Sequence, residues 1–219
     1  MQTKGQDSPG ADSSQLGVLL IDAQPGFWDY AFPGDGAGRE PVMVRIEHLL
    51  MLAGWRELPV VATFEEPVAR HGELPGRLEA VFPASGQRFT KRTYNLTLER
   101  TISRALKRLP VRQWVVAGAE TDVCVMQSVL GLLRLGYQVF LLEDCLFTTE
   151  PHPGPALRRM ELAGAVPTTL KSLAYELVVS TDRTPWYPEG WIDRERGYAK
   201  PFPKGYTPPE DWPEWAPKL

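Results

Sequence analysis

Residues 113–125, QWVVAGAETDVCV, contain the transition that decides the fold. The first six residues form an apolar run, which is typical of a strand covered on both faces in a parallel sheet. The following residues, 125–135, are apolar on most sides, and Gly136 after them is a fitting helix C-cap. A buried strand that leads at once into a buried helix is the start of a βαβ unit. Cys124 is therefore expected in the first turn of that helix.

Similar apolar runs occur elsewhere in the chain, and amphipathic segments separate them. Strands are predicted at residues 17–21, 59–64 and 138–142, and more weakly at 166–170, where a proline favours a sheet edge. Helices are predicted at residues 42–52 and 96–109. Residues 74–90 show no clear periodicity and predict a long loop. The alternation predicts an α/β fold, with a parallel sheet between two layers of helices.

The composition divides the chain into three parts. Residues 1–15 are small and polar and predict a flexible tail, and residues 16–180 carry the strand and helix patterns of one domain. Residues 181–219 are rich in proline and aromatic residues, which predicts an extended arm packed on its own domain or on a neighbouring subunit.

Charge and cysteine content narrow the class of protein. The formal net charge is -3, from 24 basic and 27 acidic residues that are mixed along the chain. Without a basic run or stripe, no nucleic-acid partner and no membrane surface is expected. The N-terminus lacks the apolar stretch of a signal peptide, and the two cysteines are too few for a disulfide framework. We expect a cytoplasmic protein with reduced thiols.

Three side chains of chemical interest are expected at one edge of the sheet. Asp22 ends the first predicted strand, Lys91 precedes the helix that begins near Asn95, and Cys124 follows a central strand. Ligands bind at the carboxyl ends of the strands in such sheets, and a helix N-terminus favours a thiolate. Each residue alone has an ordinary explanation: Cys124 as a buried structural residue, Asp22 as a turn cap and Lys91 as a solvated charge.

Taken together, three segments are far more specific. Residues 19–24 (LLIDAQ) with Phe27, residues 91–95 (KRTYN) and residues 118–125 (GAETDVCV) closely resemble the isochorismatase-like cysteine hydrolase superfamily, which includes nicotinamidases, N-carbamoylsarcosine amidases and ureidoacrylate amidohydrolases. The resemblance covers roughly residues 16–180. It implies a three-layer, Rossmann-like fold with a mostly parallel six-stranded sheet, and a homodimer or homotetramer. It also implies a cis peptide bond before Glu120 and a catalytic triad of Asp22, Lys91 and Cys124.

These roles imply hydrolysis of a C–N bond in a small amide or ureido compound. Asp22 would act as acid and base, Lys91 would stabilise the ionised groups, and Cys124 would form a thioester intermediate. The backbone N–H groups of Glu120 and Cys124 would form the oxyanion hole. Two alternatives remain: a vinyl ether hydrolase of the isochorismatase type, and a non-catalytic protein that binds a small molecule in the same pocket.

The sequence departs from the nicotinamidase pattern at the metal site. Nicotinamidases of the superfamily have an Asp-x-His motif after the second strand, where this chain has Glu65 and Glu66, with His71 nearby. We therefore predict no metal and no cofactor. The two glutamates either recognise a donor group of the substrate or form a solvated turn. Phe27, Trp28 and Tyr94 are either pocket walls or packing residues, as is Phe147, and Cys145 is predicted to lie in the core.

Overall fold

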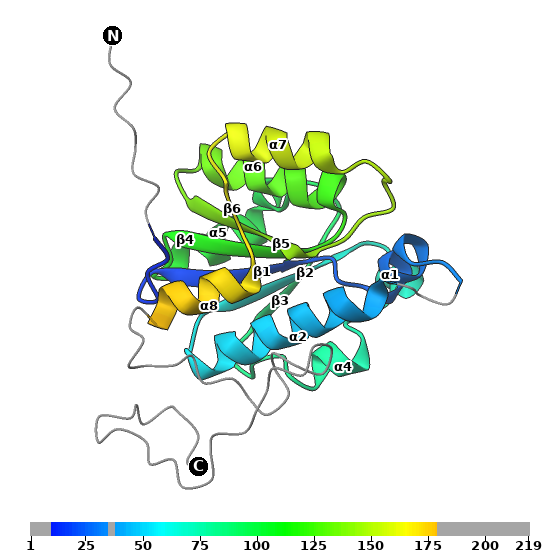
Figure 1. Ribbon diagram of the computed structural model, residues 1–219, viewed down its shortest axis with the longest axis horizontal. Helices are drawn as coiled ribbons and strands as arrows, with labels where there is room; N and C mark the ends of the chain where they lie inside the picture. Colours follow the sequence, from blue (N-terminus) through cyan, green and yellow to red (C-terminus); the bar gives the residue numbers. More distant parts are fainter. Residues whose placement is uncertain (1–9, 35–37, 179–219) are drawn as a thin grey trace, which may run out of the picture.

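The computed structural model describes residues 10–34 and 38–178, and they form one six-stranded sheet covered on both faces by helices (Figure 1). The strands are β1 (Leu16–Ile21), β2 (Val60–Glu65), β3 (Gln87–Lys91), β4 (Gln113–Gly118), β5 (Gln138–Leu146) and β6 (Val166–Thr168). Their order in the sheet is β3-β2-β1-β4-β5-β6, and every neighbouring pair is parallel. The α/β fold class is thus confirmed. The predicted proline-containing strand, β6, lies at one edge.

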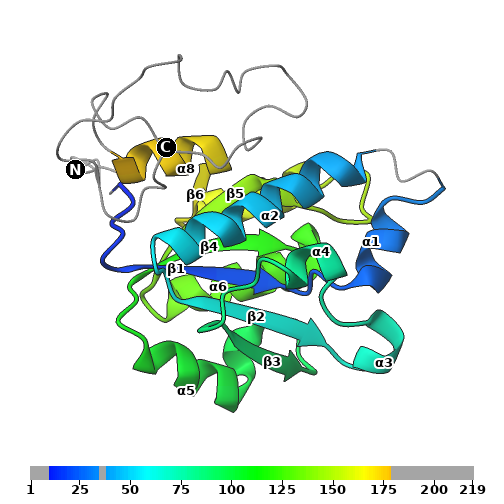
Figure 2. The same cartoon turned by 90° about the horizontal axis from the view of Figure 1, so that it is seen from below.

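Two layers of helices cover the sheet (Figures 1 and 2). The layer on one face contains α2, α4 and α8, and the layer on the other contains α5, α6 and α7. The α-helices are α1 (Pro25–Ala31), α2 (Arg39–Trp55), α3 (Val68–His71), α4 (Gly76–Glu79), α5 (Arg100–Arg108), α6 (Met126–Arg134), α7 (Gly154–Leu162) and α8 (Leu170–Val178). Two shorter helical segments, η1 (Leu96–Leu98) and η2 (Thr121–Val125), precede α5 and α6.

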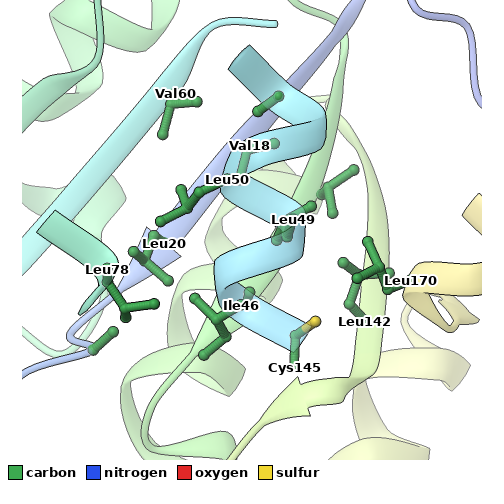
Figure 3. Packing of buried hydrophobic residues seen from close by; sticks show 14 of the residues in the cluster. Val18, Leu20, Ile46, Leu49, Leu50, Val60, Leu78, Leu142, Cys145 and Leu170 are labelled. Atoms are coloured by element: carbon green, nitrogen blue, oxygen red, sulfur yellow. The ribbon is translucent and has the colours of Figure 1, made fainter. Parts of the chain in front are cut away.

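Burial explains the apolar runs of the sequence. Every residue of β1 and β4 is buried, because these two central strands have neighbours on both sides and helices on both faces. Figure 3 shows one core cluster, in which Ile46, Leu49 and Leu50 of α2 gather beside residues of β1. Cys145 belongs to this cluster and is fully buried, which confirms the prediction of a core cysteine. Such a core fixes the sheet, and hence its carboxyl edge, as a rigid platform.

The prediction of a continuous loop over residues 74–90 is wrong. This segment contains α4 and most of β3, which pairs with β2 from Val61↔Gln87 to Glu65↔Lys91. The strand lies at the sheet edge, and two of its five residues are exposed, so it carries polar side chains and lacks a long apolar run. This strand matters for function because Lys91 is its last residue.

The ends of the described chain add two observations. Residues from the predicted N-terminal tail contact the domain, since the Ala11 N–H donates to Glu176 and the Asp12 N–H donates to Gln113. The predicted arm at residues 181–219 lies outside the described residues. Among the residues that the structure describes, no helix combines the length and the apolar character needed to cross a bilayer.

Candidate active site

Four ionisable side chains reach one point from four neighbouring strands. Lys91 ends β3, Glu65 ends β2, Asp22 follows β1, and Cys124 lies in η2 just after β4. The register places the strand ends level, with Glu65 beside Lys91 and Ile21 beside both Thr63 and Gly118. Because parallel strands end at the same edge of the sheet, residues far apart in sequence come within hydrogen-bonding distance of one another there. We call Asp22, Glu65, Lys91 and Cys124 the carboxyl-edge cluster.

The Lys91 ammonium is the centre of the cluster. Its Nζ lies 2.6 Å from Asp22 Oδ2, 3.4 Å from Glu65 Oε2 and 3.3 Å from Cys124 Sγ. The Cys124 thiol donates to the same Glu65 oxygen over 3.1 Å. The structure thus brings together the three residues predicted from sequence. It adds Glu65, for which the sequence allowed two interpretations, a pocket residue or part of a solvated turn.

Asp22 is held in place by its neighbour on β2. Its backbone N–H donates to the Thr63 carbonyl over 3.1 Å, and the Thr63 hydroxyl donates to Asp22 Oδ1 over 2.9 Å. These bonds hold Asp22 at a φ of 46°, which non-glycine residues rarely adopt. Both carboxylate oxygens therefore have fixed partners, Thr63 on one and Lys91 on the other.

The loop that carries Cys124 requires a glycine at the end of β4. Gly118 has a φ of 111°, and a Cβ atom there would lie 1.9 Å from the Ile21 carbonyl oxygen. A side chain would push β4 away from β1 directly below Asp22 and Cys124. The next peptide bond but one, Ala119–Glu120, is cis, as the family resemblance implied.

Several amide groups of this loop are already used within the protein. The Thr121 N–H donates to the Phe147 carbonyl, and the N–H groups of Val123 and Val125 both donate to the Glu120 carbonyl. These three amides are therefore unavailable to a ligand. The Glu120 carboxylate accepts from the backbone N–H and the hydroxyl of Thr149, which ties the loop to the segment after β5.

Burial and mutual charge set the ionisation of the cluster. Burial raises the pKa of Asp22, and the nearby Lys91 charge opposes this shift. Burial acts to lower the pKa of Lys91, but the charges of Asp22, Cys124 and Glu65 outweigh it and raise that pKa. Burial, followed by the Asp22 charge, strongly raises the pKa of the Cys124 thiol, against the opposing effect of Lys91. The surroundings therefore favour the neutral form of the Cys124 thiol and the charged form of Lys91.

Burial and the nearby carboxylates oppose the thiolate that a helix N-terminus would favour at Cys124. The thiol is nearly fully buried and has two carboxylates as neighbours for a single ammonium. Desolvation and negative charge both oppose its ionisation. A nucleophilic role for this thiol would require that a carboxylate takes up its proton as the new bond forms.

The cluster does not provide a vacant metal site. Donor atoms of Asp22, Glu65 and Cys124 lie within 4.8 Å of one another, but the Lys91 ammonium lies within 3.4 Å of all three and supplies the cation. His71, the nearest candidate at the position of the nicotinamidase metal motif, stacks on the Phe27 ring at a centroid distance of 4.9 Å. The residues present thus do not fit the metal set of nicotinamidases.

The other predicted pocket residues, three aromatic residues and Glu66, differ in their burial and contacts. Trp28 is fully buried, stacks on Phe147 and donates its indole N–H to the Ala23 carbonyl, as a packing residue does. Phe27 is also buried, in contact with His71. The Tyr94 side chain is exposed, while its carbonyl accepts a hydrogen bond from Ser128. Glu66 is half-buried, and its backbone N–H donates to the Lys91 carbonyl.

Sequence reasoning gave no role to Gln24, although its side chain fixes the end of β2. Gln24 is fully buried; its Oε1 accepts from the Glu65 N–H over 2.6 Å, and its Nε2 donates to the carbonyls of Glu65 and Gly72. An uncharged polar residue two positions after a strand-ending aspartate was the available signal. Gln24 anchors the backbone from which the Glu65 carboxylate reaches Cys124.

Comparison with known proteins identifies the family of this fold. The model of the isochorismatase domain family matches residues 17–172. The chain belongs to this family. Isochorismatase family protein 2A of Dictyostelium discoideum is 28% identical over 94 residues, which are 42% of this chain and 47% of that protein. The probable hydrolase YcaC of Escherichia coli is 28% identical over 169 residues, 76% of this chain and 79% of that protein.

Solved structures have the same fold. YcaC from Pseudomonas aeruginosa, described with a covalent acrylamide, has a TM-score of 0.72 and 25% identity, over 82% of this chain and 86% of its own. E. coli YcaC, described as an octameric hydrolase of unknown specificity, has a TM-score of 0.71 and 26% identity, over 78% and 83%. The nicotinamidase of Staphylococcus aureus is 15% identical with a TM-score of 0.62, over 71% and 99%. The chain has an isochorismatase-family hydrolase fold.

Proposed function

We propose that this protein is a cysteine hydrolase that cleaves a C–N bond of a small amide or ureido compound through a thioester on Cys124. The observation that carries the proposal is the position of the Lys91 ammonium, 2.6 Å from Asp22 and 3.3 Å from Cys124. A buried carboxylate, ammonium and thiol in mutual contact form a nucleophile, its base and a charge stabiliser. Neither a packing cysteine nor a solvated lysine needs such an arrangement.

The resting thiol must lose its proton during attack. Asp22, whose pKa is raised by burial, accepts this proton while the sulfur bonds to the substrate carbonyl carbon. Lys91 stabilises both the charge that develops on sulfur and the carboxylate. The backbone N–H groups of Glu120 and Cys124 bind the carbonyl oxygen as it becomes negative.

The two products leave in sequence. Asp22 returns its proton to the leaving nitrogen as the C–N bond breaks, and ammonia or an amine departs. Asp22 then removes a proton from water, which attacks the thioester and releases the acid and the Cys124 thiol. Loss of one oxyanion donor typically costs about 3–4 kcal/mol of transition-state stabilisation, so the geometry of the Cys124 loop matters for the rate as well as the thiol.

An ammonia-release screen over small carboxamides, ureido compounds and carbamoyl amines tests the proposal, with Cys124→Ala as control. We expect release by the native protein from at least one class and none by the variant. A vinyl ether hydrolase would release no ammonia and would tolerate Cys124→Ala. A binding protein would release none, and a small thiol alkylator would label its two cysteines equally slowly.

The proposal also covers the compartment, the oligomeric state and the partners of the enzyme. Cys124 and Cys145 are both free thiols, which suits a reducing compartment such as the cytoplasm. We expect a homo-oligomer, a homodimer or homotetramer by family resemblance, and E. coli YcaC is described as an octamer. Light scattering of the full chain measures this directly. The partner of the site is a small molecule, without nucleic acid, membrane or cofactor.

A further inference from the structure

The Glu65 carboxylate is the member of the carboxyl-edge cluster whose position suits contact with an incoming ligand. Its side chain is 20% exposed, whereas those of Asp22 and Lys91 are fully buried. Glu65 Oε2 nevertheless reaches Lys91 Nζ and Cys124 Sγ. A molecule that approaches the sulfur from solvent therefore meets this carboxylate beside its target.

The hydrogen bonds of the cluster distinguish its two carboxylates. Asp22 has a short ion pair on one oxygen and the Thr63 hydroxyl on the other. Glu65 Oε2 accepts a hydrogen bond from the Cys124 thiol and has a longer contact of 3.4 Å with Lys91 Nζ. When Cys124 attacks a carbonyl, the thiol proton leaves, and Glu65 loses its donor. A partly buried carboxylate that loses a hydrogen bond needs a replacement.

The geometry of attack supplies this replacement. The carbonyl oxygen of a substrate above Cys124 would face the backbone amides of the Cys124 loop, so its nitrogen would lie on the side of the carboxylates. Gln24 holds the backbone of Glu65 from both its N–H and its carbonyl, so only the Glu65 side chain is left to adjust. An ionised carboxylate can accept a hydrogen bond from an N–H group but has no hydrogen of its own to donate.

We propose that Glu65 is a substrate-binding residue that exchanges the Cys124 thiol for an N–H group on the nitrogen of the scissile bond. The substrate class is thereby limited to carbonyl compounds with at least one hydrogen on that nitrogen, such as primary amides and ureido compounds. Esters and fully substituted amides lack the donor. This inference rests on the proposed function, because it uses Cys124 as the attacking group.

A pair of thiol reagents tests the exchange without knowledge of the natural substrate. Acrylamide has two N–H groups, and N,N-dimethylacrylamide has none. Each adds Cys124 sulfur to its terminal alkene carbon, and the thiol proton ends on the adjacent carbon of the reagent. Intact-protein mass spectrometry gives the rate for each reagent, and division by the rate with free cysteine removes their intrinsic difference.

The native protein is expected to prefer acrylamide by about tenfold to a hundredfold after this correction, the value of one hydrogen bond to a charged acceptor. Glu65→Leu should abolish the preference, and Glu65→Gln should reduce it. Glu47→Gln is the matched control, because the Glu47 side chain has the same 20% exposure as that of Glu65 but pairs with Arg77 outside the carboxyl-edge cluster, and it should leave the preference unchanged. A thermal melt of each variant verifies that it is folded.

The outcomes separate this inference from the proposed function. Equal corrected rates for the two reagents in the native protein, or a full acrylamide preference in folded Glu65→Gln and Glu65→Leu, would overturn the role of Glu65. Ammonia release that depends on Cys124 would still stand in that case. Absence of both ammonia release and Cys124 labelling would instead overturn the proposed function, and the inference with it.

Discussion

Replacement of Lys91 by methionine, which has a similar length and no charge, tests how the cluster is held together. The ammonium is the cationic partner of Asp22, and both side chains are fully buried. Lys91→Met leaves the Asp22 carboxylate with the Thr63 hydroxyl as its described donor. Breaking a buried ion pair by removal of one partner costs about 3–5 kcal/mol. We expect a loss of this size in the free energy of unfolding at neutral pH.

The structure also predicts an asymmetry between the two partners. After Asp22→Asn, Lys91 still has Glu65 at 3.4 Å, so this variant should lose less stability than Lys91→Met. The double variant carries neither charge and should recover part of the loss, which a double-mutant cycle measures as a coupling energy. Replacing both members of a buried pair is often nearly neutral.

Urea denaturation of the four proteins, followed by circular dichroism, is the assay. At this chain length each kcal/mol corresponds to about 2–4 °C in Tm, so Lys91→Met should melt roughly 6–20 °C lower. Lys107→Met is the control, because Lys107 is exposed on α5, and its cost should stay within about 0.5 kcal/mol. Additive single-variant losses, or a Lys91→Met variant as stable as the native protein, would refute the reasoning.

Three further predictions concern the same edge of the sheet. Burial and the Asp22 charge raise the pKa of the Cys124 thiol, and Lys91 lowers it, so iodoacetamide labelling of Cys124 should accelerate as pH rises above neutral. Lys91→Met should move this acceleration to higher pH and Glu65→Gln to lower pH. A labelling profile unchanged in both variants would contradict the charge assignment. Gly118→Ala should lower the free energy of unfolding by more than about 1 kcal/mol and reduce turnover, because the new Cβ would overlap the Ile21 carbonyl; a stable, fully active variant in urea titration and ammonia assays would contradict this. Thr63→Val removes a hydrogen bond that lowers the Asp22 pKa, so the acid limb of the activity–pH profile should shift to higher pH, and an unmoved limb would show that Asp22 is not the titrating base.

Much of the fold could be predicted because the central strands are buried on both faces. The runs that became β1 and β4 are apolar at nearly every position, so they stand out in the sequence. Strand β3 could not be recognised in the same way, because an edge strand with exposed polar side chains has no such run. Lys91 was nevertheless identified, because residues 91–95 resemble the family motif; Asn95 in this motif is the N-cap of the short helix η1.

The sequence predicted which residues form most of the candidate site, but it did not predict the electrostatics of the site. Asp22 and Cys124 each adjoin a recognisable strand, which places them at the carboxyl edge. The orientation of Glu65 depends on the register between β2 and β3 and on its anchor Gln24, neither of which has a sequence pattern of its own. The pKa of the Cys124 thiol depends on how many carboxylates lie near the single ammonium, and only the folded structure shows this number.

The most direct test of the account is a search for the acyl group on Cys124 during turnover. The amide that gives the fastest ammonia release is mixed with the full-length protein, the reaction is stopped with acid within the first turnovers, and the digested protein is analysed by mass spectrometry. We predict that the peptide containing Cys124 carries the mass of the substrate acyl group and that the peptide containing Cys145 is unmodified. Steady ammonia release with an unmodified Cys124 peptide, together with retained activity in Cys124→Ala, would contradict a cysteine nucleophile.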